Sequence, residues 1–170
     1  MKRIRYCVAT SLDGFITGPN GEIDWIEIDP DIDFETFFKQ FDTVLMGKES
    51  YLITQQGPGA VMPGMKTYVC SQSLSSNEHP EVTIVSDAIA TAKRLKAEDG
   101  KDIWLFGGGQ LFRSLLDARL VDTVEIVVMP IILSDGIPLI SPGLRSSRLQ
   151  LKESKTLSSG AQSLSYEVQN

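Results

Sequence analysis

The sequence contains few of the side chains that bind transition metals or serve as catalytic bases in hydrolases. Its 170 residues include one histidine, His79, and two cysteines, Cys7 and Cys70. A structural zinc site needs four ligands, mostly histidine and cysteine, and a Ser-His-Asp or Cys-His centre needs a histidine beside its nucleophile. Both cysteines lie in apolar, strand-like runs, and His79 lies in a loop where we expect it to be exposed. The composition therefore predicts no metal site and argues against these hydrolytic chemistries.

Excess positive charge and long apolar runs are also absent. The chain has 16 Lys and Arg residues against 22 Asp and Glu residues, a formal net charge of −6. Nucleic acids and anionic membranes attract basic patches, so we expect the protein to bind neither. No apolar run approaches the roughly 20 residues of a membrane span, and the N-terminus lacks the apolar region of a signal peptide. These features predict a cytoplasmic protein that forms a single domain over residues 1–170.

The sequence does contain a glycine-rich turn between a predicted strand and a predicted helix. Residues 103–106 are all apolar, and Leu111, Leu115 and Leu116 follow at helical spacing. Three glycines, 107–109, separate the two elements. Glycine lets a ligand approach the backbone closely, and the helix N-terminus behind it offers free N–H groups and partial positive charge. One glycine would fit a connection that binds nothing, but three in succession favour a nucleotide phosphate site, although the spacing differs from the GxGxxG fingerprint.

Two other predicted strands also end in residues that could bind a phosphate or a ribose. Gly47, Lys48 and Ser50 follow one apolar strand, and Ser71 follows the next. A lysine and small hydroxyls suit phosphate or ribose oxygens, although such a hydroxyl can equally cap a turn. Ligands of open α/β sheets bind at the carboxyl ends of parallel strands. Together, the three strand ends could hold the two phosphate regions of a dinucleotide.

The order of the predicted elements indicates the fold class. Strands and helices alternate up to about residue 119, and strands alone follow, including an apolar strand at 123–129. Residues 149–157 and 162–168 flank a turn sequence and predict a terminal β-hairpin. This pattern predicts an α/β fold of three layers, α/β/α, with a central mixed sheet that is parallel early and antiparallel at its C-terminal end. The 123–129 strand and the hairpin could supply a homodimer interface.

The loop after the first predicted strand, 4–10, contains Asp13, Asp24 and Trp25. A long loop with an exposed tryptophan is often a lid above a ligand. The alternative is an Ω-loop in which Trp25 fills part of the core. Both interpretations fit the sequence.

A phenylalanine-rich helix is predicted to begin at Pro30. Phe34, Phe37, Phe38 and Phe41 fall at i, i+3, i+4 and i+7 and would form one apolar face. The acidic residues of the first turns favour the helix macrodipole and are expected to be solvated. Asp31 lies nearest the phenylalanine face, so it could instead point into a cleft.

Three motifs resemble those of the dihydrofolate-reductase-like superfamily, and the similarity spans nearly the whole chain. They are Ser11-Leu12-Asp13-Gly14, Met46-Gly47-Lys48-Glu49-Ser50-Tyr51 and Phe106-Gly107-Gly108-Gly109-Gln110-Leu111-Phe112. More narrowly, the chain resembles stand-alone relatives of the reductase domain of bifunctional riboflavin-biosynthesis deaminase/reductase enzymes. The resemblance implies an NADPH-dependent oxidoreductase with a small-molecule substrate, similar to 5-amino-6-(5-phosphoribosylamino)uracil reductase or to dihydrofolate reductase.

The resemblance also implies where the cofactor and substrate bind. The cofactor residues it implies are Ala9, Gly47, Lys48, Ser50, Ser71, Gly107, Gly108, Gly109, Gln110 and Leu111. Among these, Gly107 to Gln110 would hold the pyrophosphate, Ser71 would lie near the 2′-phosphate, and Ala9 would line the nicotinamide end. Trp25 matches the tryptophan of the mobile loop above the substrate, and Asp13 matches an aspartate beside the substrate.

One departure from the family pattern concerns the substrate. Dihydrofolate reductases proper have a pterin-binding carboxylate on the first helix, and matching Phe38-Lys39 to the family's Phe-Lys pair places Phe34 at or near that position. Asp31 or Glu35 could replace the carboxylate only if the helix shifts. No basic cluster for a ribose phosphate stands out. The substrate is therefore expected to be a small heterocycle, pyrimidine-like or pterin-like, or a carbonyl compound, with Phe34 in the substrate site.

The chemistry expected is hydride transfer to an electrophilic carbon in a dry cleft. The proton could come from Asp13, Asp31 or water, and a carboxylate near the apolar helix face would have a pKa raised by desolvation. The alternatives are true dihydrofolate reduction and a protein that binds NADPH or another nucleotide without catalysis.

Overall fold

The structure, a computed structural model, describes residues 1–55, 62, 64–143 and 146–169. Its strands are β1 (Ile4–Thr10), β2 (Phe15–Thr17), β3 (Phe41–Gly47), β4 (Lys66–Cys70), β5 (Thr83–Val85), β6 (Asp102–Gly107), β7 (Thr123–Val128), β8 (Ile137–Pro138), β9 (Arg148–Thr156) and β10 (Gln162–Gln169). Its helices are α1 (Phe34–Phe38), α2 (Lys48–Gln55), α3 (Ala88–Ala97) and α4 (Gly109–Asp117). Within this part of the chain, no helix has the length and apolarity needed to cross a membrane.

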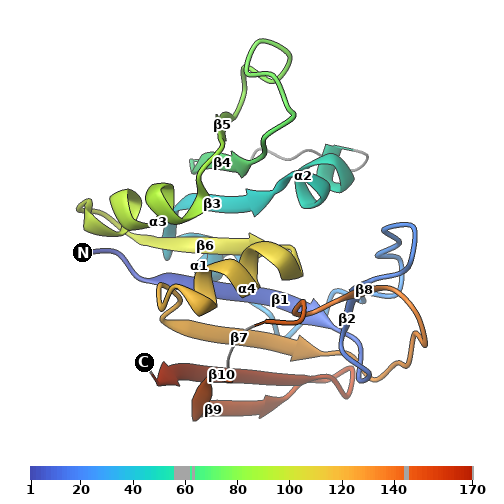
Figure 1. Cartoon of the computed structure of the whole chain (residues 1–170). Coiled ribbons are helices and arrows are strands. Elements are labelled where there is room, and N and C mark those ends of the chain that lie inside the picture. The colour runs from blue at the N-terminus through green and yellow to red at the C-terminus, as the bar shows by residue number, and fades with distance from the viewer. Residues whose placement is uncertain (56–61, 63, 144–145, 170) are drawn as a thin grey trace.

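One large sheet organises the molecule, with the strand order β5-β4-β3-β6-β1-β7-β10-β9 (Figure 1). All pairs from β5 to β7 are parallel, whereas β10 is antiparallel to both β7 and β9. The predicted mixed sheet, parallel early and antiparallel at the C-terminal end, is confirmed. Because β4, β3, β6 and β1 are parallel neighbours, their carboxyl ends share one edge of the sheet, which positions the candidate site.

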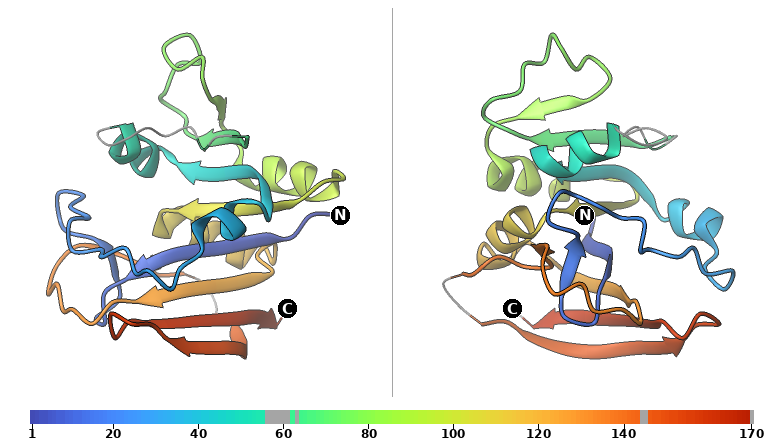
Figure 2. Two further views of the ribbon diagram at one scale, coloured as in Figure 1. Left: turned by 180° about the vertical axis from the view of Figure 1, so that it is seen from behind. Right: turned by 90° about the vertical axis from the view of Figure 1, so that its right-hand side faces the viewer.

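Helices cover both faces of this sheet, as the right-hand view of Figure 2 shows. On one face, α3 and α4 bury their leucines against β1 and β6, where the Tyr6 ring stacks on Phe112 with centroids 3.8 Å apart. On the other face, α1 and α2 pack over Cys7 and Trp104. Successive strand residues point to opposite faces, so Tyr6 and Cys7 enter different cores. The three-layer α/β/α arrangement is therefore confirmed.

The phenylalanine-rich helix is shorter than its periodicity predicts. It begins at Phe34 rather than Pro30, because the Asp33 carboxylate accepts a hydrogen bond from the Thr36 N–H and caps the helix there. It ends at Phe38, and Phe41 begins β3 instead of continuing the helical face. The prediction of one helix from Pro30 through Phe41 was wrong. The phenylalanines nevertheless share one cluster, because Phe37 and Phe41 both pack against Trp104.

Candidate active site

Glycines at the ends of β3 and β6 bring these two strand ends into close contact. A Cβ atom on Gly47 would lie 3.7 Å from both the Gly107 carbonyl oxygen and the Gly108 nitrogen. A Cβ atom on Gly108 would lie 3.5 Å from the Ser50 hydroxyl oxygen. Gly107 has a φ of +129°, a conformation that favours glycine. The structure therefore groups four of the residues predicted to hold phosphates, and a side chain on Gly108 would contact Ser50.

The start of α4 lies directly behind these glycines. Gly108 is its N-cap residue and makes no side-chain capping hydrogen bond, so the helix begins without a side-chain cap. Leu111 is buried in the core, which leaves its backbone rather than its side chain for a ligand. Gly109 has a different role, because a Cβ atom there would lie 2.6 Å from the Pro138 carbonyl oxygen. Gly108 borders the predicted phosphate site, whereas Gly109 allows α4 to pack against residues 138–140.

Lys48 and Ser71 lie at the ends of β3 and β4. The Lys48 ammonium donates a hydrogen bond of 3.1 Å to the Ser73 hydroxyl. The Ser71 hydroxyl accepts hydrogen bonds from the Ser73 and Leu74 N–H groups, at 3.1 and 3.0 Å. Ser71 therefore caps a turn, the second of the roles its position allows, and that turn places Ser73 beside Lys48. One cation and two hydroxyls therefore lie close together in space at this end of the edge, although Lys48 and Ser73 are 25 residues apart in the chain.

A buried tyrosine anchors α2, the helix that carries Lys48 and Ser50. The Tyr51 hydroxyl lies 2.8 Å from His79 Nδ1, accepts a hydrogen bond of 2.5 Å from Gln55, and donates to Glu81. The His79 side chain is 16% exposed. The prediction that His79 is an exposed loop residue was therefore wrong, since its ring holds the 79–81 segment to α2.

Asp13, predicted to act in catalysis, joins two loops. Its carboxylate accepts hydrogen bonds from the Leu133 and Ser134 N–H groups, at 3.1 and 2.8 Å. Desolvation acts to raise the pKa of Asp13, but hydrogen bonding to Ser11, Leu133 and Ser134 outweighs it and holds the pKa below its usual range. This direction is opposite to the one expected for a proton donor near neutral pH.

Asp31, the other predicted catalytic carboxylate, binds the tip of the β9–β10 hairpin. It accepts hydrogen bonds from the Ser158 N–H and hydroxyl, at 2.9 and 2.8 Å. Asp29 binds beside it, accepting from the Ser159 N–H at 2.7 Å and from the Asp31 N–H at 2.8 Å. Residues 29–31 therefore form a strap tied to the hairpin, with Asp29 2% exposed.

Trp25, on the N-terminal side of this strap, packs against a core cluster formed by Met129, Leu157 and Ala161. Its indole N–H donates to the Glu22 carbonyl oxygen at 3.0 Å. In this structure Trp25 fills part of the core, as the Ω-loop interpretation expects, and its neighbours Ile26 and Glu27 line the adjacent cavity.

The strap is expected to loosen in acid, and Asp29 provides the test. Hydrogen bonding to Ser159 above all, and to the Asp31 backbone, holds the pKa of Asp29 below its ordinary value of 3.8. A carboxyl group with a depressed folded-state pKa stabilises the fold above its unfolded pKa and loses that contribution as the pH falls through the folded value. Urea unfolding should therefore show Asp29→Asn less stable than the wild type at pH 7, with the difference shrinking towards pH 3.

Asp24→Asn is the matched control, since Asp24 is an exposed aspartate of the same loop. It should leave the urea midpoint near the wild-type value at both pH values. An Asp29→Asn protein as stable as the wild type at pH 7 would show that the strap contributes nothing to stability.

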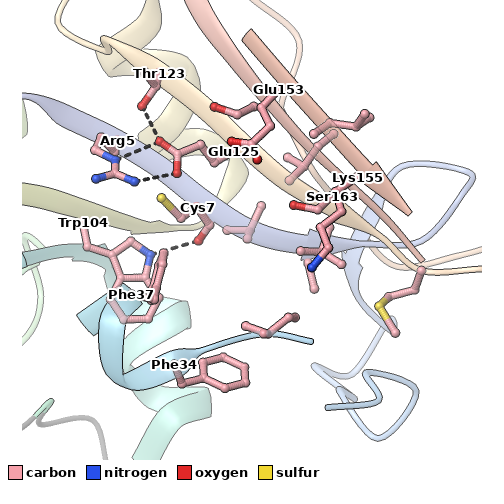
Figure 3. A pocket seen from close by; sticks show the side chains of 18 of the residues that line it. Arg5, Cys7, Phe34, Phe37, Trp104, Thr123, Glu125, Glu153, Lys155 and Ser163 are labelled. Carbon is pink, nitrogen blue, oxygen red and sulfur yellow. Dashed lines mark hydrogen bonds and ion pairs between the residues drawn. The ribbon is translucent and has the colours of Figure 1, made fainter. Parts of the chain in front are cut away.

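A cavity of about 670 Å³ lies between the sheet and the segments that flank the strap, residues 26–28 and 32–37 (Figure 3). Such a volume suits a small organic ligand. Ala9 and Phe34, predicted to lie at the cofactor and substrate ends, both line it, together with Phe37 and Trp104. Asp31 and Glu35 are not among the described residues that line it, and Glu35 instead pairs with Lys39 at 2.6 Å. The structure therefore brings neither of these carboxylates to the place of the pterin-binding group.

The cavity also contains an ion pair that the sequence did not reveal. Arg5 on β1 binds Glu125 on β7 through two hydrogen bonds, Nε to Oε1 at 2.8 Å and Nη2 to Oε2 at 2.7 Å. The Thr123 hydroxyl donates to Oε1 at 2.8 Å. The signal that could have found this pair is a charged residue inside each of two otherwise apolar strands, because such residues are rarely buried unless paired.

Known proteins share both the sequence pattern and the fold. The model of the RibD C-terminal domain family matches residues 2–163. The chain belongs to this family. It is also 32% identical over 177 aligned positions to YyaP of Bacillus subtilis (strain 168), a protein described as uncharacterised, covering 97% of this chain and 94% of the relative.

Two solved structures of related fold bear on the architecture. One is a Shewanella sp. PV-4 protein named for riboflavin biosynthesis, with a TM-score of 0.84, 22% identity and full coverage of both chains. The other is a Thermotoga maritima diaminohydroxyphosphoribosylaminopyrimidine deaminase/5-amino-6-(5-phosphoribosylamino)uracil reductase, with a TM-score of 0.72 and 16% identity, covering 99% of this chain and 57% of that one. At these identities the likeness to the two solved structures establishes a shared fold. The family match confirms the resemblance to riboflavin-biosynthesis reductase domains that the three motifs indicate.

Proposed function

We propose that this protein is an NADPH-dependent reductase of a small heterocyclic or carbonyl substrate. The observation that carries the proposal is the position of two features on neighbouring strands of the sheet. Gly47, Gly107 and Gly108 bring the ends of β3 and β6 together at the start of α4, and β1, the neighbour of β6, presents Ala9 to the cavity. Membership of the RibD C-terminal domain family supports a reductase role.

The residues at this edge fit the parts of NADPH by their chemistry. Backbone N–H groups at the start of α4 suit a pyrophosphate, and the absence of a Cβ at Gly108 allows it to approach. Lys48, with the Ser71 and Ser73 hydroxyls, suits the 2′-phosphate of the adenosine half. When bound in this way, NADPH supplies a hydride. The chain has a net charge of −6, so these local groups must supply the attraction for phosphate.

The cavity then orients the substrate beside Ala9. Phe34, Phe37 and Trp104 form an aromatic wall that holds a planar ring and excludes water. Asp13 and Asp31 are engaged by backbone groups of neighbouring loops, and the pKa of Asp13 is lowered. We therefore assign the proton to water, and Asp13 and Asp31 to holding the loops around the site. Dihydrofolate reduction is the weaker candidate, since the described lining has no carboxylate on α1.

Titration with NADPH and NADH tests the proposal, with nicotinamide fluorescence as the readout. The wild type should bind NADPH more tightly than NADH. Lys48→Ala should weaken NADPH binding about tenfold or more, because a charge-assisted hydrogen bond to the 2′-phosphate is lost, and should change NADH binding little. NADPH oxidation with pyrimidine, pterin and carbonyl substrates then separates a catalyst from a protein that only binds the nucleotide.

Lys93→Ala is the control for loss of positive charge, because Lys93 is an exposed lysine of α3. It should change neither dissociation constant. If the wild type fails to bind NADPH at millimolar concentration, the proposed function is wrong. If Lys48→Ala weakens NADPH and NADH binding equally, Lys48 does not recognise the 2′-phosphate.

A further inference from the structure

Helix α2 and the segment 71–82 carry the groups at the adenosine end of the proposed cofactor site. The segment links β4 to β5 and contains neither helix nor strand. The Lys48 ammonium of α2 donates to the Ser73 hydroxyl of the segment. Within the described part of the chain, every side-chain hydrogen bond between this segment and another element reaches α2. The position of Ser73 relative to Lys48 therefore depends on how the segment is held to the helix.

The link between the two elements is the hydroxyl of a buried tyrosine. Lys48, Tyr51 and Gln55 are spaced i, i+3 and i+7, so they share one side of α2. The Tyr51 ring is fully buried and meets the His79 ring edge-on, with centroids 5.1 Å apart. Its hydroxyl bonds both His79 and Glu81. A helix rises about 1.5 Å per residue, so this link lies roughly 4.5 Å from Lys48 along the helix axis.

The chemistry of these side chains fixes the direction of each hydrogen bond. A carboxylate only accepts, so the Tyr51 hydroxyl donates its one proton to Glu81. Burial above all, and then the hydrogen bond and charge of Glu81, raise the pKa of Tyr51 to about 12, so the hydroxyl keeps that proton at neutral pH. The Tyr51 oxygen then accepts from both Gln55 Nε2 and His79 Nδ1, at 2.5 and 2.8 Å. The geometry therefore requires a proton on His79 Nδ1. Together these four side chains form the Tyr51 cluster.

We propose that the Tyr51 cluster sets the discrimination of this protein between NADPH and NADH: it fastens the segment 71–82 to α2 and thereby holds the Ser73 hydroxyl beside the Lys48 ammonium, where both reach a 2′-phosphate. The proposal rests on the proposed reductase function, because it concerns the adenosine end of the same site. The members of the cluster are positioning residues, since they act through Lys48 and Ser73 and not on the cofactor itself.

The protonated nitrogen of His79 tests the cluster without any cofactor. His79 is the only histidine of the chain, so the nuclear magnetic resonance signals of its ring are unambiguous. In isotope-labelled protein at pH 8, the nitrogen shifts should identify Nδ1 as the protonated nitrogen and Nε2 as the unprotonated one. Tyr51→Phe removes only the hydroxyl of the buried ring and should abolish this preference. A proton on Nε2 in the wild type, or an unchanged preference in Tyr51→Phe, would overturn the proposed geometry.

Titration with NADPH and NADH measures the effect on discrimination. Tyr51→Phe should weaken NADPH binding about fivefold, because Ser73 is no longer held beside Lys48, and should leave NADH binding within about twofold. His79→Leu should act in the same direction, whereas His79→Gln should retain most of the NADPH affinity, because its amide N–H can donate to the Tyr51 oxygen. In a Lys48→Ala background, Tyr51→Phe should cause little further loss, since both changes act on one contact.

Tyr68→Phe is the matched control, because it removes a hydroxyl from β4, the strand that leads into the segment. The Tyr68 ring packs on the opposite face of the sheet, beneath the Arg94 guanidinium at 5.5 Å. Both dissociation constants should stay within about twofold of the wild-type values in this variant. A cooperative thermal transition shows that each variant is folded.

The results distinguish failure of this proposal from failure of the proposed function. If NADPH binds, the role of the cluster is wrong when Tyr51→Phe weakens NADPH and NADH binding equally, when it changes neither, or when its effect simply adds to that of Lys48→Ala. The reductase proposal stands in all three cases. If the wild type does not bind NADPH at millimolar concentration, the reductase proposal fails and the role in discrimination fails with it.

Discussion

Gly108→Val is expected to abolish measurable NADPH binding while leaving the protein folded. Gly108 has φ −86° and ψ −168°, an extended conformation that valine adopts readily. Its Cβ atom would lie 3.5 Å from the Ser50 hydroxyl and 3.9 Å from Ile16 Cδ1, which is ordinary contact. In the proposed function, the two valine methyl groups would then stand where a pyrophosphate approaches the N–H groups of α4. Losing about two charge-assisted hydrogen bonds weakens binding by about a hundredfold or more.

Nicotinamide fluorescence measures the loss in Gly108→Val, and circular dichroism with thermal unfolding checks the fold. The thermal midpoint should stay close to that of the wild type. Gly108→Ala provides an intermediate, since it adds the Cβ atom alone and should weaken NADPH binding less than valine does. Wild-type NADPH affinity in the valine variant would contradict the assignment of phosphate to this turn.

Gly109→Val is expected to destabilise the fold strongly, although it lies one residue away. A Cβ atom on Gly109 would lie 2.6 Å from the Pro138 carbonyl oxygen and 3.3 Å from both Ile140 Cα and the Leu139 carbonyl oxygen. All three are backbone atoms, so no side-chain rotation relieves the overlap. Overpacking of this kind costs about 3 kcal/mol, which lowers the thermal midpoint of a protein of this size by about 10 °C.

Urea unfolding of Gly109→Val at pH 7 gives the free energy directly. Gly108→Val is the control for adding a valine side chain, because a Cβ atom there meets only ordinary contacts, at 3.5 Å or more, on extended backbone. The Gly109 variant should be clearly the less stable of the two. Equal stability would show that α4 can move away from residues 138–140 at little cost.

These two glycines show the limit of a motif read from sequence. The succession of three glycines predicts a turn that a ligand can approach, and the structure places Gly107 and Gly108 at the turn between β6 and α4. The same motif does not distinguish Gly109, whose missing side chain serves the packing of α4 on a segment about 30 residues further along. Only the position of Pro138 separates the two roles.

The sequence by itself determined the features that depend on neighbouring residues. Asp87 caps α3 by accepting a hydrogen bond from the Ala90 N–H, three residues away, so residues within one turn define where this helix begins. The apolar runs became β1, β3, β4, β6 and β7, and the terminal hairpin formed close to its predicted bounds. Local propensity and periodicity suffice for such elements because both the signal and the structure lie within one short segment. From these elements the class of sheet, parallel early and antiparallel at its C-terminal end, could be inferred, whereas the order of its strands could not.

The tertiary structure alone decided which side chains meet. Asp31, which the sequence left either solvated or facing a cleft, binds Ser158, which lies 127 residues away, and Arg5 binds Glu125, which lies 120 residues away. The register of β1 against β7 places Cys7 beside Glu125 and thereby brings the ion pair into the cavity wall. A carboxylate binds whichever donors the fold brings within about 3 Å, and no local pattern contains that information. The sequence therefore determined the elements and the glycine-lined edge, and long-range strand pairing decided which charged groups line the cavity.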